Sequence, residues 1–102
     1  SGGANIYPAE IERAIEGHPD VAGAAVIGVP DPKWGEVGKA VVELKPGASL
    51  TLEALVSFLK NRLGKFKLPK YLKVVDTLPR TPASAKVQKF ILKDKHGGAD
   101  ND

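Results

Sequence analysis

Apolar residues recur at helical spacing in three parts of the chain, and this pattern predicts three helices. The first is expected from Pro8 to Glu16, with three apolar side chains on one face: Ile11, Ala14 and Ile15. The second is expected after Thr51, a residue type that caps helices, and before Gly64. Its apolar stripe consists of Leu52, Leu55, Val56, Leu59 and Leu63. A third, short helix is predicted to begin at Lys86.

Three runs rich in β-branched and small apolar residues predict strands. They are expected at Val21 to Val29, Ala40 to Leu44 and Tyr71 to Val75. The first run is apolar or small on both faces, which is typical of a strand covered on each side, and we expect it in the middle of the sheet. Together with the helices, the runs predict an α+β domain with a small, three-stranded, largely antiparallel sheet flanked by helices.

Size and composition narrow the possible functions. A chain of 102 residues is enough for one compact core and small for an enzyme with several substrates. It has no cysteine and no apolar run that could form a transmembrane segment, and we expect a cytoplasmic location. The net charge of +3 favours contact with phosphate groups but is modest for a nucleic-acid binder, so no nucleic-acid partner is expected.

Few motifs in the chain carry chemistry. The two histidines, His18 and His96, have no paired spacing, so we expect no metal site. The chain has neither a glycine-rich phosphate loop nor a dinucleotide fingerprint. One cation is distinctive, because the small residues from Thr81 to Ala85 form a loop that delivers Lys86 at its end. The pattern alone favours an ordinary solvated lysine over one that seeks an anionic partner.

Three stretches of the sequence resemble motifs of one enzyme family. They are residues 1–12 (SGGANIYPAEIE), 26–36 (VIGVPDPKWGE) and 78–93 (LPRTPASAKVQKFILK). The last stretch resembles the final core motif of the acyl- and aryl-CoA ligases, which are members of the acyl-adenylate-forming, or AMP-binding, superfamily. The resemblance implies that residues 1–94 are the mobile C-terminal domain of such a ligase. The polar residues 95–102 are expected to form a disordered tail.

The resemblance implies that Lys86 is the catalytic lysine of the adenylation reaction. Counted back from the Val-Gln-Lys that follows it, Lys86 has the register of the family's lysine. Counted from Pro79, it arrives one residue late, and Ala85 stands in place of the customary glycine. We interpret this difference as a one-residue insertion near Ala83.

The resemblance also implies which residues contact CoA. Gly2 and Gly3 are expected to line the tunnel through which the pantetheine arm reaches the acyl-adenylate. Trp34 is expected to stack on the nucleotide end, while Phe66 and Lys67 supply an aromatic face and a charge. Without the resemblance, the residues also allow other interpretations. The two glycines can belong to a linker, Trp34 can be a partly buried aromatic residue that covers the end of the sheet, and the loop around Phe66 can be an ordinary solvated turn.

The resemblance implies that other parts of the enzyme lie outside this chain. The resemblance assigns ATP and Mg²⁺ mainly to an N-terminal AMP-binding domain of the same protein, together with the carboxylic acid substrate. The hinge residue is expected before Ser1, and the chain alone is expected to be inactive. Two alternatives remain open. One is the C-terminal part of a peptide synthetase adenylation domain, and the other is a non-catalytic basic module that binds nucleotides or RNA.

Overall fold

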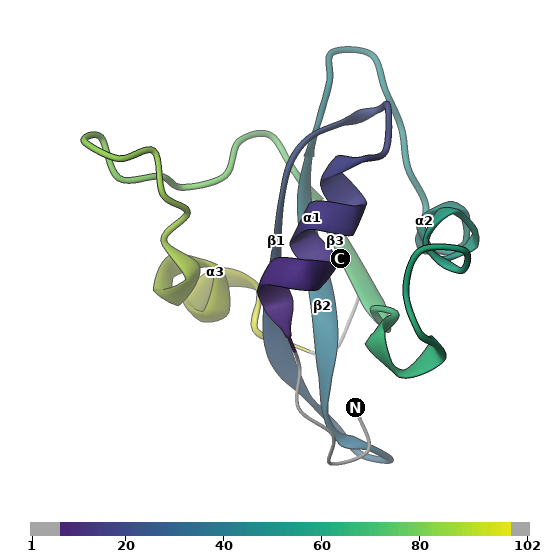
Figure 1. Cartoon of the computed structure of the whole chain (residues 1–102). Helices are drawn as coiled ribbons and strands as arrows, with labels where there is room; N and C mark the ends of the chain where they lie inside the picture. The colour runs from purple at the N-terminus through teal and green to yellow at the C-terminus, as the bar shows by residue number, and fades with distance from the viewer. Residues whose placement is uncertain (1–6, 99–102) are drawn as a thin grey trace.

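The computed structural model describes residues 7–98, which form helices around a small sheet (Figure 1). In chain order the elements are α1 (Pro8–Glu16), β1 (Val21–Asp31), β2 (Gly35–Leu44), α2 (Leu52–Leu59), the 3₁₀ turn η1 (Lys65–Lys67), β3 (Tyr71–Val75) and α3 (Lys89–His96). The predicted α+β class is confirmed. Within the described residues, no helix combines the length and the apolar character that a membrane span requires.

The sheet is mixed and has the strand order β1-β2-β3. β1 and β2 form a long antiparallel hairpin, which extends from the Val21–Leu44 pair to the Asp31–Gly35 pair. β3 joins β2 in parallel over a shorter stretch that begins at the Lys39–Tyr71 pair. The antiparallel pairing is therefore the longer one. The predicted middle position of β1 is wrong, because β2 lies in the middle.

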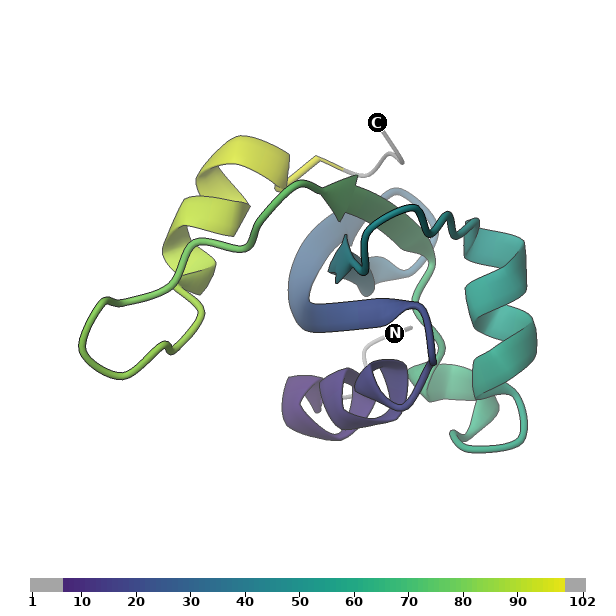
Figure 2. The same cartoon turned by 90° about the horizontal axis from the view of Figure 1, so that it is seen from above.

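Helices cover both faces of the sheet, which explains why β1 is apolar on both sides although it is an edge strand. α1 and α2 pack on one face and α3 packs on the other (Figures 1 and 2). The larger core cluster lies against α1 and α2: Ile11, Ile15, Val21, Ala24, Val26, Ala40, Val42, Leu55, Leu59, Leu63 and Leu72. The smaller cluster lies on the α3 side: Ala25, Ile27, Val29, Val37, Val41, Leu78 and Leu92.

One lysine is buried in the centre of the sheet. Lys39 belongs to β2 and is 0% exposed, and it lies between Val37 and Val41 on the face that α3 covers. Its Nζ donates a hydrogen bond to the carbonyl oxygen of Gly98, just beyond α3, at 3.0 Å. This contact ties the chain that follows α3 to the central strand.

Two elements, α1 and β3, have the predicted bounds, and the others differ at one end or both. β1 continues past Val29 to Asp31, and β2 begins at Gly35 rather than at Ala40. α2 begins after Thr51, whose hydroxyl accepts a backbone N–H of the first turn, but it ends at Leu59 rather than near Leu63. α3 includes Lys95 and His96, so these two residues are helical and not part of a disordered tail. The end of the tail lies outside the described residues.

Residues 80–87, here called the Lys86 loop, project from the body of the domain (Figures 1 and 2). A backbone bridge between Arg80 and Val87 closes the base of the loop. Inside it, the backbone N–H of Thr81 donates to the carbonyl oxygen of Lys86 at 2.9 Å. The Thr81 hydroxyl also accepts the N–H of Lys86 at 3.2 Å. Both the N–H and the carbonyl oxygen of Lys86 are therefore hydrogen-bonded to Thr81.

Ala85, directly before the lysine, has a left-handed backbone conformation with a φ of 57°. Its N–H donates to the carbonyl oxygen of Thr81 at 2.8 Å, which fixes this conformation. Val87 pairs with Arg80 in an antiparallel bridge, and the carbonyl oxygen of Lys86 accepts the N–H of Thr81, so these residues pair across the loop instead of forming a helical turn. The predicted helix start at Lys86 is therefore wrong, and α3 begins at Lys89. Ala85 occupies the position where the resemblance leads us to expect glycine, the residue that adopts this conformation without steric cost.

We predict that Ala85→Gly raises the free energy of unfolding by about 0.5–1 kcal/mol. Relief of a left-handed alanine, worth about 1–2 kcal/mol, exceeds the added flexibility of glycine in the unfolded chain. The matched control is Ala83→Gly in the same loop, where φ is not positive. That substitution should lower the free energy of unfolding by about 0.5–1 kcal/mol. Urea denaturation of both variants checks the prediction, and an equal loss in both would contradict it.

Candidate functional site

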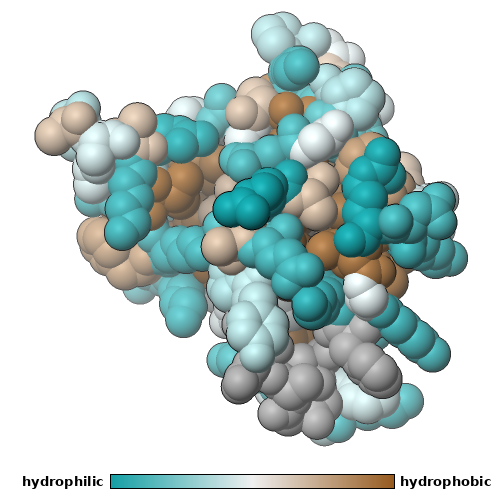
Figure 3. Space-filling model, viewed as in Figure 1, coloured by the Kyte–Doolittle hydropathy of each residue, from teal (hydrophilic) through white to brown (hydrophobic). Residues whose placement is uncertain are grey.

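A groove runs between α1 and the Lys86 loop and continues along the start of α3. Its charged lining consists of Glu12, Arg13, Glu16, Arg80, Lys86 and Lys89, and its apolar lining includes Ala9, Ala24, Val87 and Phe90. Figure 3 shows an apolar hollow on this side of the molecule, bordered by hydrophilic side chains. Lys86 is exposed on the loop side of the groove, so its ammonium group can approach an anion that enters there.

Arg80 ties the Lys86 loop to the edge strand β1. Its Nη1 donates to the carbonyl oxygen of Ala85 at 3.0 Å. The guanidinium group lies against Gly23, where a Cβ atom would be only 2.6 Å from Nη2. Gly23 therefore leaves the space in which Arg80 crosses the strand and supports the residue before the lysine.

Glu12 makes a second tie at the same strand edge. Its Oε2 accepts the backbone N–H of Val26 at 2.8 Å and lies 2.6 Å from the Nζ of Lys89. Lys89 is the first residue of α3 and follows the Lys86 loop closely. Sequence reasoning missed this three-way contact, because local spacing rules do not link residues so far apart in the chain.

The turn between β1 and β2 is built around Asp31. Its Oδ1 accepts the backbone N–H groups of Lys33 at 2.8 Å and of Trp34 at 2.9 Å, and its Oδ2 accepts the Tyr71 hydroxyl at 2.9 Å. The hydrogen bond from Trp34, followed by that from Lys33, lowers the pKa of the Asp31 carboxyl below its ordinary value. Gly35 completes the turn with a φ of 85°. The position of Trp34 is thus set by backbone bonds.

Trp34 is 40% exposed, and the ammonium groups of two lysines lie near its ring. The Nζ of Lys33 is 4.9 Å from the centroid of the indole ring, and the Nζ of Lys70 is 5.9 Å from it. Both ammonium groups are within reach of a cation–π interaction. An exposed indole with two cations nearby can stack on an aromatic ring and attract attached phosphates. Sequence analysis predicted Trp34, but not its two lysine neighbours.

Lys67 faces the start of α1 rather than Trp34. Its Nζ donates to Oε1 of Glu10 at 2.8 Å and lies 5.7 Å from the centroid of the Tyr7 ring. Gly2 and Gly3 lie outside the described residues, and so does the side chain of Phe66. Of the five residues predicted to contact CoA, Trp34 and Lys67 can therefore be placed.

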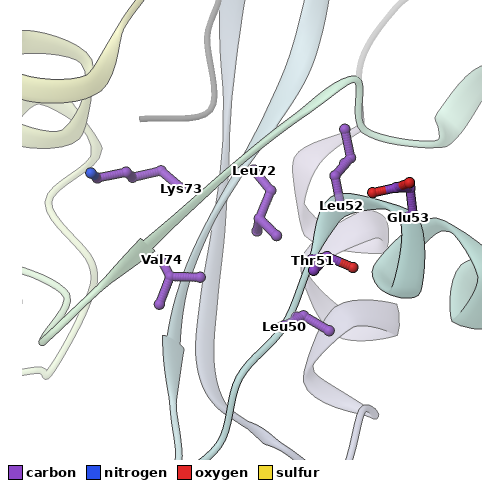
Figure 4. A pocket seen from close by; sticks show the side chains of 7 residues that line it. All are labelled: Leu50, Thr51, Leu52, Glu53, Leu72, Lys73 and Val74. Carbon is purple, nitrogen blue, oxygen red and sulfur yellow. The ribbon is translucent and has the colours of Figure 1, made fainter.

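Two further observations concern the surface outside the groove at Lys86 and the turn at Trp34. Within residues 7–98, no three His, Cys, Asp or Glu side chains are grouped closely enough to hold a metal ion. A separate hollow lies between β3 and the start of α2 (Figure 4). Its lining is Leu50, Thr51, Leu52, Glu53, Leu72, Lys73 and Val74, which includes none of the predicted site residues.

Known proteins are similar to this chain in both sequence and fold. The family model for the AMP-binding enzyme C-terminal domain matches residues 10–85. A 3-[(3aS,4S,7aS)-7a-methyl-1,5-dioxo-octahydro-1H-inden-4-yl]propanoyl:CoA ligase from Rhodococcus jostii is 50% identical over 95 residues, which are 93% of this chain and 18% of that protein. A feruloyl-CoA synthase from Amycolatopsis is 47% identical over 97 residues, which are 95% of this chain and 20% of that protein.

A solved structure of a Mycobacterium tuberculosis fatty acyl CoA synthetase superposes with a TM-score of 0.86 at 40% identity. The match covers 95% of this chain and 19% of that one. The chain thus spans about a fifth of the length of the relatives that it matches. The family match, the sequence identity and the shared fold agree, and the chain belongs to the AMP-binding enzyme C-terminal domain family.

Proposed function

We propose that this chain is the mobile C-terminal domain of an ATP-dependent ligase that joins an acyl or aryl carboxylic acid to CoA. The observation that carries the proposal is Lys86, an exposed cation on a hydrogen-bonded loop at the rim of a groove. Membership of the AMP-binding enzyme C-terminal domain family supports it. The rest of the protein supplies an N-terminal AMP-binding domain, which holds ATP, Mg²⁺ and the acid.

Lys86 acts in the first half-reaction. A carboxylate oxygen attacks the α-phosphorus of ATP, the bond to pyrophosphate breaks, and an acyl-adenylate forms. Two anions meet in this step, and negative charge increases on the phosphoryl oxygens. A cation held nearby stabilises that charge more in the transition state than in the ground state. The hydrogen bonds of the Lys86 loop suit this task, because they position the lysine backbone before the reaction.

In the second half-reaction, the thiol sulfur of CoA attacks the carbonyl carbon of the acyl-adenylate, and AMP leaves. The domain rotates, so that Lys86 moves away and the segment with Gly2 and Gly3 enters. Trp34 then stacks on the adenine of CoA, while Phe66 and Lys67, on the loop before β3, supply an aromatic face and a charge to another part of the nucleotide. The two ammonium groups beside the exposed indole support this role, because CoA carries phosphates next to its adenine.

The first test separates the two half-reactions in the full-length ligase. We predict that Lys86→Ala lowers the rate of ATP–pyrophosphate exchange by about 10²- to 10³-fold, because the fixed cation is lost. Thioester formation from preformed acyl-adenylate should persist. The control is Lys60→Ala, which removes an exposed lysine at the end of α2. Unchanged exchange in the Lys86 variant would refute the assigned role.

The second test concerns the CoA site. We predict that Trp34→Ala raises the KM for CoA by about tenfold or more, because a base stacked on an aromatic ring gains about 1–3 kcal/mol. ATP–pyrophosphate exchange should not change. Trp34→Phe keeps a stacking face and should recover part of the loss. If the KM for CoA is the same in all three proteins, the nucleotide binds elsewhere.

A further inference from the structure

We propose that Glu12 is a positioning residue for Lys86, acting through Lys89. The inference rests on the proposed function, in which Lys86 serves the adenylation step. The proposal gives α1 a role in the first half-reaction. The residues just before α1, Gly2 and Gly3, are proposed to act in the second half-reaction. The contact that carries it is the carboxylate of Glu12, shared between the edge of β1 and the start of α3.

The carboxylate of Glu12 is fixed before it meets Lys89. Its Oε2 accepts the N–H of Val26, a group on the outer edge of β1, at 2.8 Å. The side chain is only 19% exposed, so water competes little for this bond. The backbone of β1 is itself paired with β2 on its other edge. The sheet therefore holds the carboxylate in one place and one orientation.

Lys89 transfers this fixed position to the Lys86 loop. Its Nζ lies 2.6 Å from the same Oε2, and its backbone begins α3. An ion pair on an open surface contributes little to stability, but a charge-assisted hydrogen bond to a fixed acceptor restricts where the donor can lie. Only Val87 and Gln88 separate Lys89 from Lys86. The ion pair therefore limits the motion of the chain on the C-terminal side of the lysine.

The N-terminal side of the loop has its own tether. Arg80 lies against Gly23 and donates to the carbonyl oxygen of Ala85. Lys86 is thus held between two attachments to the same edge strand, one at Gly23 and one at Val26. Loss of either attachment leaves the loop closed by its internal bonds but free to tilt as a unit.

A tilt matters because transition-state stabilisation depends on the position of the charge. A misplacement of about 1 Å can cost about 10²-fold in rate. Glu12→Gln has nearly the same shape and retains an oxygen for the Val26 N–H, but it removes the charge that holds Lys89. The substitution therefore loosens the tether without opening the core. Lys86 itself remains present and chemically unchanged.

The experiment is a double-mutant cycle in the full-length ligase with Glu12→Gln, Lys89→Gln and the two combined. We expect each single variant to lower the turnover of ATP–pyrophosphate exchange by about tenfold, and the double variant to be no slower. Thioester formation from preformed acyl-adenylate should be unchanged. Lys89→Arg, which keeps the ion pair, should retain exchange.

Glu43→Gln is the matched control. The Glu43 carboxylate also accepts a backbone N–H, that of Leu78 at 3.0 Å, and its substitution should leave exchange unchanged. If Glu12→Gln retains exchange, or if the two single effects add, the inference is wrong. If exchange, thioester formation and thermal stability fall together, Glu12 has a structural role only, and the inference is also wrong.

Lys86→Ala, measured in parallel, separates this inference from the proposed function. If Lys86→Ala loses exchange and Glu12→Gln does not, the positioning role fails while the proposed function stands. If Lys86→Ala retains exchange, both fail together. If both variants lose exchange and both retain thioester formation, with a smaller loss for Glu12→Gln, the positioning role is supported.

Discussion

The outer edge of β1 is the constraint on which the rest of the structure depends. An edge strand carries backbone N–H and C=O groups that no further strand can pair. β1 is also apolar on both faces, so helices must cover it on each side. Side chains from both ends of the chain then reach the open edge, where Glu12 accepts the Val26 N–H and Arg80 lies over Gly23. This cover brings α1 and the Lys86 loop, distant in sequence, to one strand.

The β1–β2 hairpin also separates the two candidate surfaces. The Lys86 loop is attached near the beginning of β1, whereas Trp34 lies in the turn at its far end (Figure 1). The two strands of the hairpin are paired along their length and mostly buried, so the hairpin is rigid and keeps the two surfaces at a fixed distance. In the proposed ligase, a rotation of the whole domain can therefore exchange one surface for the other without internal rearrangement.

The sequence predicts what depends on local patterns. The apolar spacing of α1 and the β-branched run of β3 gave their observed bounds, and the hydroxyl of Thr51 marked the start of α2. Features that depend on distant partners were missed. Apolar faces could not show that β1 is an edge strand, because an edge strand under two helices reads like a central one. The helical spacing around Lys86 was misleading, because Val87 pairs with Arg80 and both backbone groups of Lys86 bond to Thr81 across the loop.

The same distinction applies to the candidate site. The resemblance implies Trp34 and Lys67 as contacts of CoA, which stays a prediction, whereas the lysines beside the indole and the contact of Lys67 with Glu10 depend on how the turns pack. The proposed role of Glu12 rests only on the three-dimensional arrangement. Its two partners, Val26 and Lys89, belong to a strand and a helix that the sequence gives no reason to join.

The buried lysine in β2 has a consequence for where this domain can be cut. Lys39 is fully enclosed, and the carbonyl of Gly98 is an acceptor for its ammonium group. The folded unit therefore extends beyond residue 85, where the family match ends, and beyond α3 itself. A recombinant fragment trimmed at either point would remove an acceptor from a charge inside the sheet, which is costly. Gly98 thus belongs to the domain's interior chemistry rather than to a dispensable terminus.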